Sequence, residues 1–218
     1  MDPVDPQLQA GSVFNQQAIQ QPQPNNEWYW IPSWYAGTKR VDSERILQDY
    51  NFRTGQMSQP NRVVTNRQQL SIGFQADKNG QVWEFKRAPY TTTVEGDGFF
   101  TTLMVKNRDP LKVTQDVVVL RLVQTSINVD QRSQRILKTM QEEQINTYTP
   151  GPNGVMNMQT SIKTFDSNGN PELQETSVRT VYTTAPFQPV DTYQGRDMKM
   201  LFKSFLLTHG LSGYMPPD

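Results

Sequence analysis

The residue types that most often carry catalysis or bind metals are scarce in this sequence. Its 218 residues include no cysteine and a single histidine, His209. The lack of cysteine excludes thiol catalysis, disulfides and thiolate metal sites. One histidine alone gives little support to a transition-metal site or a Ser-His-Asp triad, and His209 suits the last turn of a helix, where an imidazolium is favourable. We therefore predict no catalytic residue, no metal ligand and no cofactor.

Two acidic, glycine-containing segments are better explained as turns than as sites. Residues 166–170 (DSNGN) match the start of a calcium loop, but Pro171 stands where that loop needs glycine and Ser177 where it needs glutamate. Residues 95–98 (EGDG) contain two carboxylates, yet glycosidase chemistry needs carboxylates that face each other across a cleft. An enzyme that uses carboxylates and tyrosines is therefore the least favoured of three functional hypotheses.

The charge balance excludes another class of function. The chain has 21 basic and 21 acidic residues and no basic run, so it has no global field to attract nucleic acid. No stretch approaches the ~18 apolar residues of a membrane span. Residues 1–6 lack the start of a signal peptide, which leaves two readings, a cytosolic protein or a mature form whose signal was removed. We favour an extracytoplasmic location (periplasmic, envelope-associated or secreted), because the chain has no free thiols.

Aromatic residues are the best candidates for binding. Three of the four tryptophans lie within residues 28–38 (WYWIPSWYAGT), where Pro32 prevents a regular central strand or a continuing helix. Such a segment either buries its rings as a plug of the domain or presents them to a ligand, glycan or protein partner.

Residues 70–85 predict the clearest hairpin. Apolar residues alternate with polar ones in the first half, which is typical of a strand with one buried face. Asn79-Gly80 predicts a two-residue type I′ turn. In that register Phe74 faces Phe85, and the apolar side chains of both strands share one side of the sheet.

Further strands favour an antiparallel meander. We expect strands at residues 90–94, 99–106, 115–129, 135–148, 156–165 and 173–183, although residues 135–148 also allow a helix. Residues 107–110 (NRDP) are expected to end the second of these strands. Short turns favour antiparallel neighbours, and a meander of about eight strands must close, form two sheets or expose its edges. The fold prediction is an all-β, up-and-down antiparallel β-barrel.

The two ends of the chain differ from the meander. Residues 1–27 are rich in Gln, Pro and Asn and are predicted to be a disordered tether. Such a tether is either a frayed terminus or a spacer, as in lipoproteins whose lipidated cysteine precedes a linker of this kind. Residues 197–209 predict an amphipathic helix with Asp197 as N-cap and Gly210 just beyond its end. One domain is then expected to span residues 28–218.

The order of these features resembles the lipocalin or wider calycin group. The resemblance rests on the aromatic segment, the Gly-Thr before the first strand, the meander and the late helix. The G-x-W motif of that group corresponds here to Gly37-Thr38-Lys39, so the role of its tryptophan falls to Trp34 or Trp30. What the resemblance implies is a cup-shaped barrel able to hold an apolar molecule.

The leading hypothesis is a non-enzymatic, exported β-barrel that binds a small hydrophobic ligand. Its predicted binding residues are Trp30, Trp34, Leu70, Ile72, Phe74, Trp83 and Phe85. The alternative is a structural or interaction module of the cell envelope, whose aromatic segment or sheet edge meets a protein partner or a second copy of the chain. A continuous interior cavity of at least ~300 Å³ favours the first hypothesis over the second.

Overall fold

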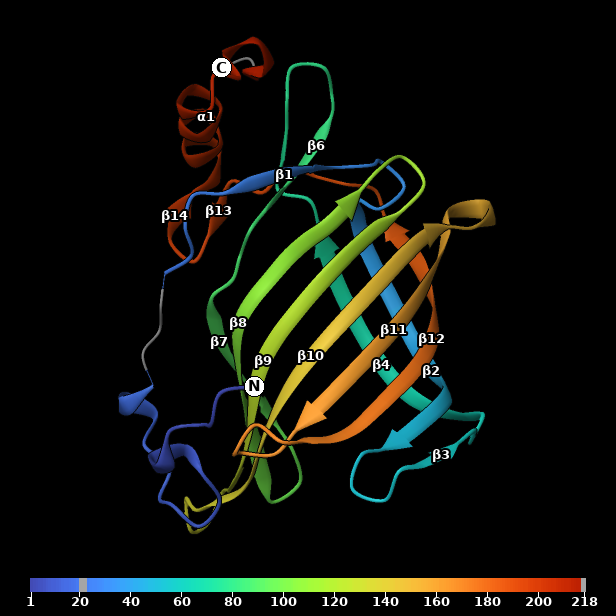
Figure 1. Ribbon diagram of the computed structural model, residues 1–218. Coiled ribbons are helices and arrows are strands. Elements are labelled where there is room, and N and C mark those ends of the chain that lie inside the picture. The colour runs from blue at the N-terminus through green and yellow to red at the C-terminus, as the bar shows by residue number, and fades with distance from the viewer. Residues whose placement is uncertain (20–22, 217–218) are drawn as a thin grey trace.

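The protein is mostly β-structure, with antiparallel sheets and one C-terminal helix (Figure 1). The computed structural model describes residues 1–19 and 23–216. The predicted antiparallel β-structure and the predicted C-terminal helix are both confirmed.

One large sheet makes up most of the molecule. Its strands are β2 (Gly37–Asn51), β3 (Gln56–Ser58), β4 (Arg62–Ile72), β7 (Tyr90–Glu95), β8 (Phe99–Val113), β9 (Val118–Asp130), β10 (Ile136–Pro150), β11 (Val155–Phe165) and β12 (Pro171–Ala185). The order β4-β2-β12-β11-β10-β9-β8-β7 joins each strand to antiparallel neighbours, and β3 pairs with β2. The expected strand at residues 135–148 is confirmed as β10. The predicted meander is therefore present, with β12 returning to pair with β2.

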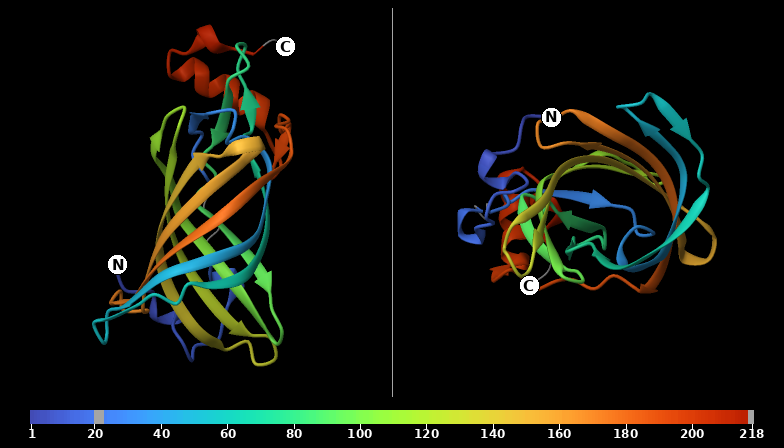
Figure 2. Two further views of the ribbon diagram at one scale, coloured as in Figure 1. Left: turned by 90° about the vertical axis from the view of Figure 1, so that its right-hand side faces the viewer. Right: turned by 90° about the horizontal axis from the view of Figure 1, so that it is seen from below.

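The large sheet curls strongly around its own axis (Figure 2). Its edge strands are β4 and β7, and no backbone pairing joins these two edges within the described residues. The gap falls where the chain leaves the sheet after β4 and forms a second, smaller sheet before it returns at β7. Closure of the barrel stays a prediction.

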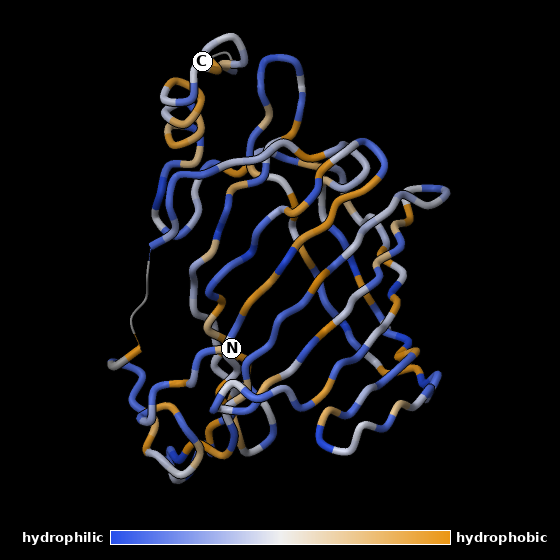
Figure 3. The backbone as a smooth tube through the Cα atoms, in the orientation of Figure 1, coloured by the Kyte–Doolittle hydropathy of each residue, from blue (hydrophilic) through white to orange (hydrophobic). Residues whose placement is uncertain are grey.

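The small sheet lies at one end of the large one. It contains β1 (Trp28–Ile31), β5 (Gln75–Ala76) and β6 (Val82–Phe85) in the order β1-β6-β5. A two-stranded ribbon, β13 (Thr192–Tyr193) and β14 (Arg196–Asp197), leads into helix α1 (Met198–Thr208). The helix is rich in apolar residues (Figure 3), and its Phe202 packs in one cluster with Trp28 and Trp83 of the small sheet. The helix therefore caps the small sheet.

The helix termini match their prediction. The Asp197 side chain accepts a hydrogen bond from the Met200 N–H at 2.8 Å, which satisfies one free donor of the first turn. His209 is the C-cap residue, and Gly210 follows it with a φ of 70°. The Leu211 N–H then bonds back to the Leu206 carbonyl, as in a Schellman ending. Within the described residues no helix is long and apolar enough to cross a membrane.

The hairpin predicted at residues 70–85 is wrong in two respects. The chain changes direction at Gly73, which follows β4 and has a φ of 95°. The strand expected before the turn is therefore divided between two sheets, as β4 and β5. The turn is also one residue longer than predicted. The Asp77 carboxylate accepts hydrogen bonds from the N–H groups of Asn79 and Gln81, and Gly80 alone has a positive φ. This is a type I turn with a glycine bulge, and it shifts the pairing by one residue.

Strand β8 also runs further than expected. Residues 107–110 were predicted to end it, but it continues to Val113. Two irregularities, at Lys106 and Leu111, interrupt its pairing with β9. A bulge bends a strand without ending it. Pro110, which has no N–H to donate to the ladder, is therefore tolerated next to the irregularity at Leu111.

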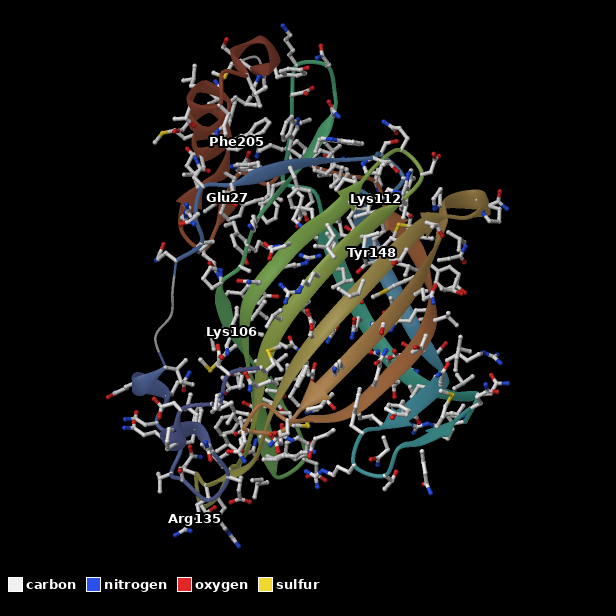
Figure 4. The ribbon with its side chains drawn as sticks, in the orientation of Figure 1. Glu27, Lys106, Lys112, Arg135, Tyr148 and Phe205 are labelled. Carbon is white, nitrogen blue, oxygen red and sulfur yellow. The ribbon has the colours of Figure 1, made fainter. Side chains whose placement is uncertain are left out.

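The N-terminal segment differs most from its prediction as a disordered tether. Residues 1–19 pack along the outer face of β9 and β10, and Figure 4 shows Arg135 beside them. Phe14 and Ile19 are buried against Ile127, Val129 and Ile136. Backbone hydrogen bonds reinforce this contact, including Gly11 N–H to the Ile136 carbonyl and Ile136 N–H to the Ser12 carbonyl. A few well-spaced apolar residues thus order a segment whose average composition predicted disorder.

Candidate ligand-binding site

A pocket of about 520 Å³ opens at the rim where the large sheet meets the aromatic segment. Five parts of the chain form its walls: the segment before β2, the start of β2, the start of β6, the β10–β11 turn, and the end of β12 with the segment after it. Its lining is Ser33, Trp34, Ala36, Lys39, Val82, Gly151, Gly154, Val155, Thr183, Pro186 and Phe187. Most of these side chains are apolar or small, as in typical small-molecule pockets.

Lys39 supplies the only charged side chain of this lining. Alternation along β2 places it on the inner face with Val41, and it is 1% exposed. Its Nζ donates to the Trp34 carbonyl and to the Thr183 hydroxyl, both at 2.9 Å. Among the described residues no carboxylate forms an ion pair with it. Burial therefore lowers the pKa of Lys39 to about 8.

Gly37 lets the start of β2 approach the end of β12 closely enough to form this rim. It has a φ of 104°, and a Cβ at this position would lie 2.6 Å from the Ala185 carbonyl oxygen. Any other residue would force the two strands apart. Lys39 and Thr183, which face each other across this strand pair, would then separate.

Trp34 also lines the pocket and is only half-buried. Its indole N–H donates to the Gln115 carbonyl, and its ring meets Tyr35 edge-on at 5.7 Å. Tyr35 in turn packs against Tyr148, which lies on the upper part of β10 in Figure 4. The indole is therefore held in place while part of its surface still faces the pocket.

A second buried charge, Glu84 of β6, has a very different environment. Its carboxylate accepts hydrogen bonds from the Gly73 N–H at 2.6 Å and from Arg87 at 2.7 Å, and lies 3.6 Å from Arg108. Burial, and after it the negative charge of Glu84, raises the pKa of Tyr29, so this phenol stays neutral. The cluster is internally paired and joins the small sheet to β8.

A third buried charge, Glu44 of β2, is also fully paired. It accepts hydrogen bonds from Ser177, from Arg179 at 2.8 Å and from Asn66 at 2.8 Å. Burial alone would raise the pKa of Glu44, but these hydrogen bonds outweigh it and hold that pKa below its usual value. This network joins β2, β4 and β12 on the inner face of the sheet.

Another depression of about 520 Å³ lies on the outer face of β10, β11, β12, β2 and β4. Outward-facing side chains such as Thr147, Gln159 and Arg45 line it. The one buried charge at its edge, Arg179, is already paired with Glu44. Arg45 is exposed and is hydrogen-bonded only to the Asn61 side chain, so this depression offers a ligand no buried, unpaired charge.

The predicted binding residues do not form one lining. Phe74, Trp83 and Phe85 belong to the ring cluster under α1, where Trp83 and Phe202 lie 5.7 Å apart, and Trp30 packs against the same cluster. The break at Gly73 places Phe74, Trp83 and Phe85 at the small sheet, away from Leu70 and Ile72 of β4.

The other three predicted residues lie on or near the large sheet. Ile72 is buried with Ile31 and Tyr35, which fill the upper part of the curled sheet. Leu70 is 36% exposed near the open edge. Trp34 alone among the seven lines the rim pocket. Trp30 borders a shallower neighbouring depression of about 380 Å³.

Sequence reasoning noted Lys39 only as a departure from a motif and did not assign it to the site. A signal for it was present, since Lys39 and Val41 occupy alternate positions of one strand, which puts a lysine on a buried face. The approach of Thr183 could not be inferred, because it depends on the pairing of strands 144 residues apart.

The acidic segments behave as turns. Asp166 accepts hydrogen bonds from the Asn170 side-chain amide and from the backbone N–H groups of Asn170 and Asn168, which close the β11–β12 hairpin and lower the pKa of Asp166. Residues 95–98 connect β7 to β8. Groups of three or more His, Cys, Asp or Glu residues placed to hold a metal do not occur in the described part of the chain.

Comparisons with known proteins do not assign this chain to a family. No family model, no curated protein and no solved structure matches it.

Proposed function

We propose that this protein is a non-enzymatic binding module that holds a small, largely apolar molecule in the rim pocket. The observation that carries the proposal is the Lys39 amine, buried at an apolar pocket wall without a carboxylate partner. Burying an unpaired charge is costly, and proteins usually pair such a group or neutralise it. A ligand that brings an acceptor to Nζ offsets part of this cost.

The pocket suggests how such a ligand is oriented. An apolar body fits between Trp34, Val155 and Phe187, and a carboxylate or carbonyl oxygen meets Lys39. This modifies the original hypothesis of a purely hydrophobic ligand, since one end now carries an acceptor. The cup-shaped, lipocalin-like barrel and the extracytoplasmic location remain parts of the proposal, supported by the curled sheet and by the lack of cysteine.

Binding of decanoate, followed through tryptophan fluorescence and calorimetry, tests the proposal. We expect saturable binding by the wild type and a Kd at least about tenfold weaker for Lys39→Met, since one charge-assisted hydrogen bond contributes roughly 1.5–3 kcal/mol. Lys138→Met, which removes an exposed lysine of β10, is the matched control. Equal affinity of the wild type and Lys39→Met would contradict the proposal, and no binding at all would contradict a carboxylate as the ligand.

A second function is favoured by a separate observation, the long free edge of β4. Nearly all of its side chains are exposed, and β4 pairs through only one edge, with β2. Such an edge can accept a strand from a protein partner or from a second copy of the chain. Sedimentation velocity over a concentration series tests self-pairing: a dimer that Gln69→Lys weakens is expected, and a monomer at all concentrations would leave only a foreign partner.

A further inference from the structure

The groups that contact the Lys39 amine indicate how this amine can react. Nζ is held by two neutral acceptors, the Trp34 carbonyl and the Thr183 hydroxyl, and both of these residues also line the pocket. Thr183 is oriented in turn, because its hydroxyl donates to the Gly154 carbonyl at 2.7 Å. The amine is therefore fixed at the pocket wall rather than mobile at the end of a solvated chain.

Other charged groups near this position are engaged elsewhere. Arg40, the next residue of β2, points to the opposite face, where it pairs with Asp42 at 3.2 Å and lies over the ring of Tyr182. The two buried carboxylates, Glu44 of the large sheet and Glu84 of the small sheet, have their own arginine partners. Burial lowers the pKa of Lys39, and no charged group contributes to this shift.

We propose that Lys39 binds an apolar aldehyde covalently, as an imine. This inference rests on the proposed function, because it needs the same pocket, and it narrows the ligand class to a small molecule with an apolar chain and a terminal aldehyde. The pocket walls hold the chain, and Nζ meets the carbonyl carbon.

The reaction requires no redox partner. The lone pair of the neutral amine attacks the carbonyl carbon and forms the C–N bond, while the carbonyl oxygen becomes a hydroxyl group. Loss of that oxygen as water, with the two protons of the amine, leaves the C=N bond. Lysines desolvated in apolar pockets are known to act in this way, because lowering the pKa frees the lone pair.

The burial of Lys39 makes the neutral amine available near neutral pH. With a pKa of about 8, roughly a tenth of the protein carries the neutral form at pH 7. An ordinary lysine with a pKa of 10.5 would be neutral in roughly one molecule in 3,000. We therefore expect Lys39 to react ahead of the exposed lysines.

Reductive trapping tests this inference. The full chain is incubated with octanal and cyanoborohydride, and the adduct is located by intact mass and peptide mapping. We expect one dominant adduct, on Lys39, that decanoate suppresses by competition. Lys39→Met and Lys39→Arg should lose this adduct, whereas Lys138→Met should keep it; circular dichroism checks that each variant is folded.

The outcomes separate the two proposals. In one outcome decanoate still binds, but octanal labels many exposed lysines or only the N-terminal amine. That result would overturn the imine at Lys39 and leave the proposed binding function standing. If decanoate does not bind and octanal shows no preference for Lys39, both fall. If octanal labels Lys39 selectively while decanoate does not bind, the aldehyde is favoured over the carboxylate as the ligand class.

Discussion

Glu84 and Lys39 are both buried charges, each 1% exposed, yet they are treated in opposite ways. Glu84 has two arginines and a backbone N–H around its carboxylate. Lys39 has two neutral oxygens and a pocket. A paired buried charge can hold elements together, whereas an unpaired one costs stability and stays available to a ligand. The difference separates a structural group from a candidate functional one.

The largest effect is expected when Glu84 is changed. Glu84→Gln leaves Arg87 and Arg108 without their shared counter-charge in a buried setting, and breaking such a pair costs about 3–5 kcal/mol. Urea denaturation measures the loss of unfolding free energy. Glu95→Gln, in the exposed β7–β8 hairpin, is the control and should change it by about 0.5 kcal/mol or less. A loss as small as that of the control would remove the contrast with Lys39.

Glu44 should show a smaller, pH-dependent effect. Glu44→Gln is expected to destabilise the fold by about 2–3 kcal/mol at neutral pH, because it weakens the hydrogen bonds from Arg179 and Ser177. The pKa of Glu44 is lower in the folded state, so its contribution is present above the ordinary value of 4.5 and is lost as the pH falls through the folded pKa. Urea titrations of both proteins from neutral to acid pH check this. Parallel stability curves would contradict it.

Lys39 should show its pH dependence in the alkaline range, and its charged form is the destabilising one. Its pKa is lowered by folding, from 10.5 to about 8, so the unfolded chain binds more protons between these values and the stability contributed by this site rises with pH across them. We expect the stability of the wild type relative to Lys39→Met to increase by up to about 3 kcal/mol over this interval. Tyrosines also ionise in this pH range, but they do so in both proteins, so their effect cancels when the stability of Lys39→Met is subtracted from that of the wild type. A flat difference would mean that the amine is solvated or paired.

The smallest effect concerns the Thr183 hydroxyl. Thr183→Val removes one acceptor from the Lys39 ammonium and should lower the pKa of Lys39 slightly further, by about half a unit. The pH dependence of octanal labelling at Lys39 would shift to lower pH by the same amount. Thr180→Val, on the outer face of the same strand, is the control. An upward shift would show that the hydroxyl does not support the charged amine.

Much of the large sheet was predictable from local pattern. The alternation in residues 156–165 and the turn at residues 166–170 define a hairpin almost by themselves, because short-range pairing needs only a strand period and a suitable turn. Helix α1 was equally accessible, since its N-cap, apolar spacing and terminal glycine are neighbours in sequence. These elements depend on interactions within a few residues.

Two predictions failed because a few particular side chains decided the local structure. The composition of residues 1–19 indicated disorder, but Phe14 and Ile19 find an apolar strip on β9 and β10. The hairpin register failed at Asp77, whose side chain closes a longer turn than Asn79-Gly80 alone predicts. In both cases one or two side chains outweighed an average over the segment.

The sequence by itself determined the β-class, most strand positions, the C-terminal helix and the presence of a lysine on a buried strand face. Only the tertiary structure decided which buried charges are paired. Glu84 meets Arg108 of another sheet, and Lys39 meets Thr183 across the pairing of β2 and β12. Strand periodicity specifies which way a side chain points, but not what a strand more than a hundred residues away places opposite it.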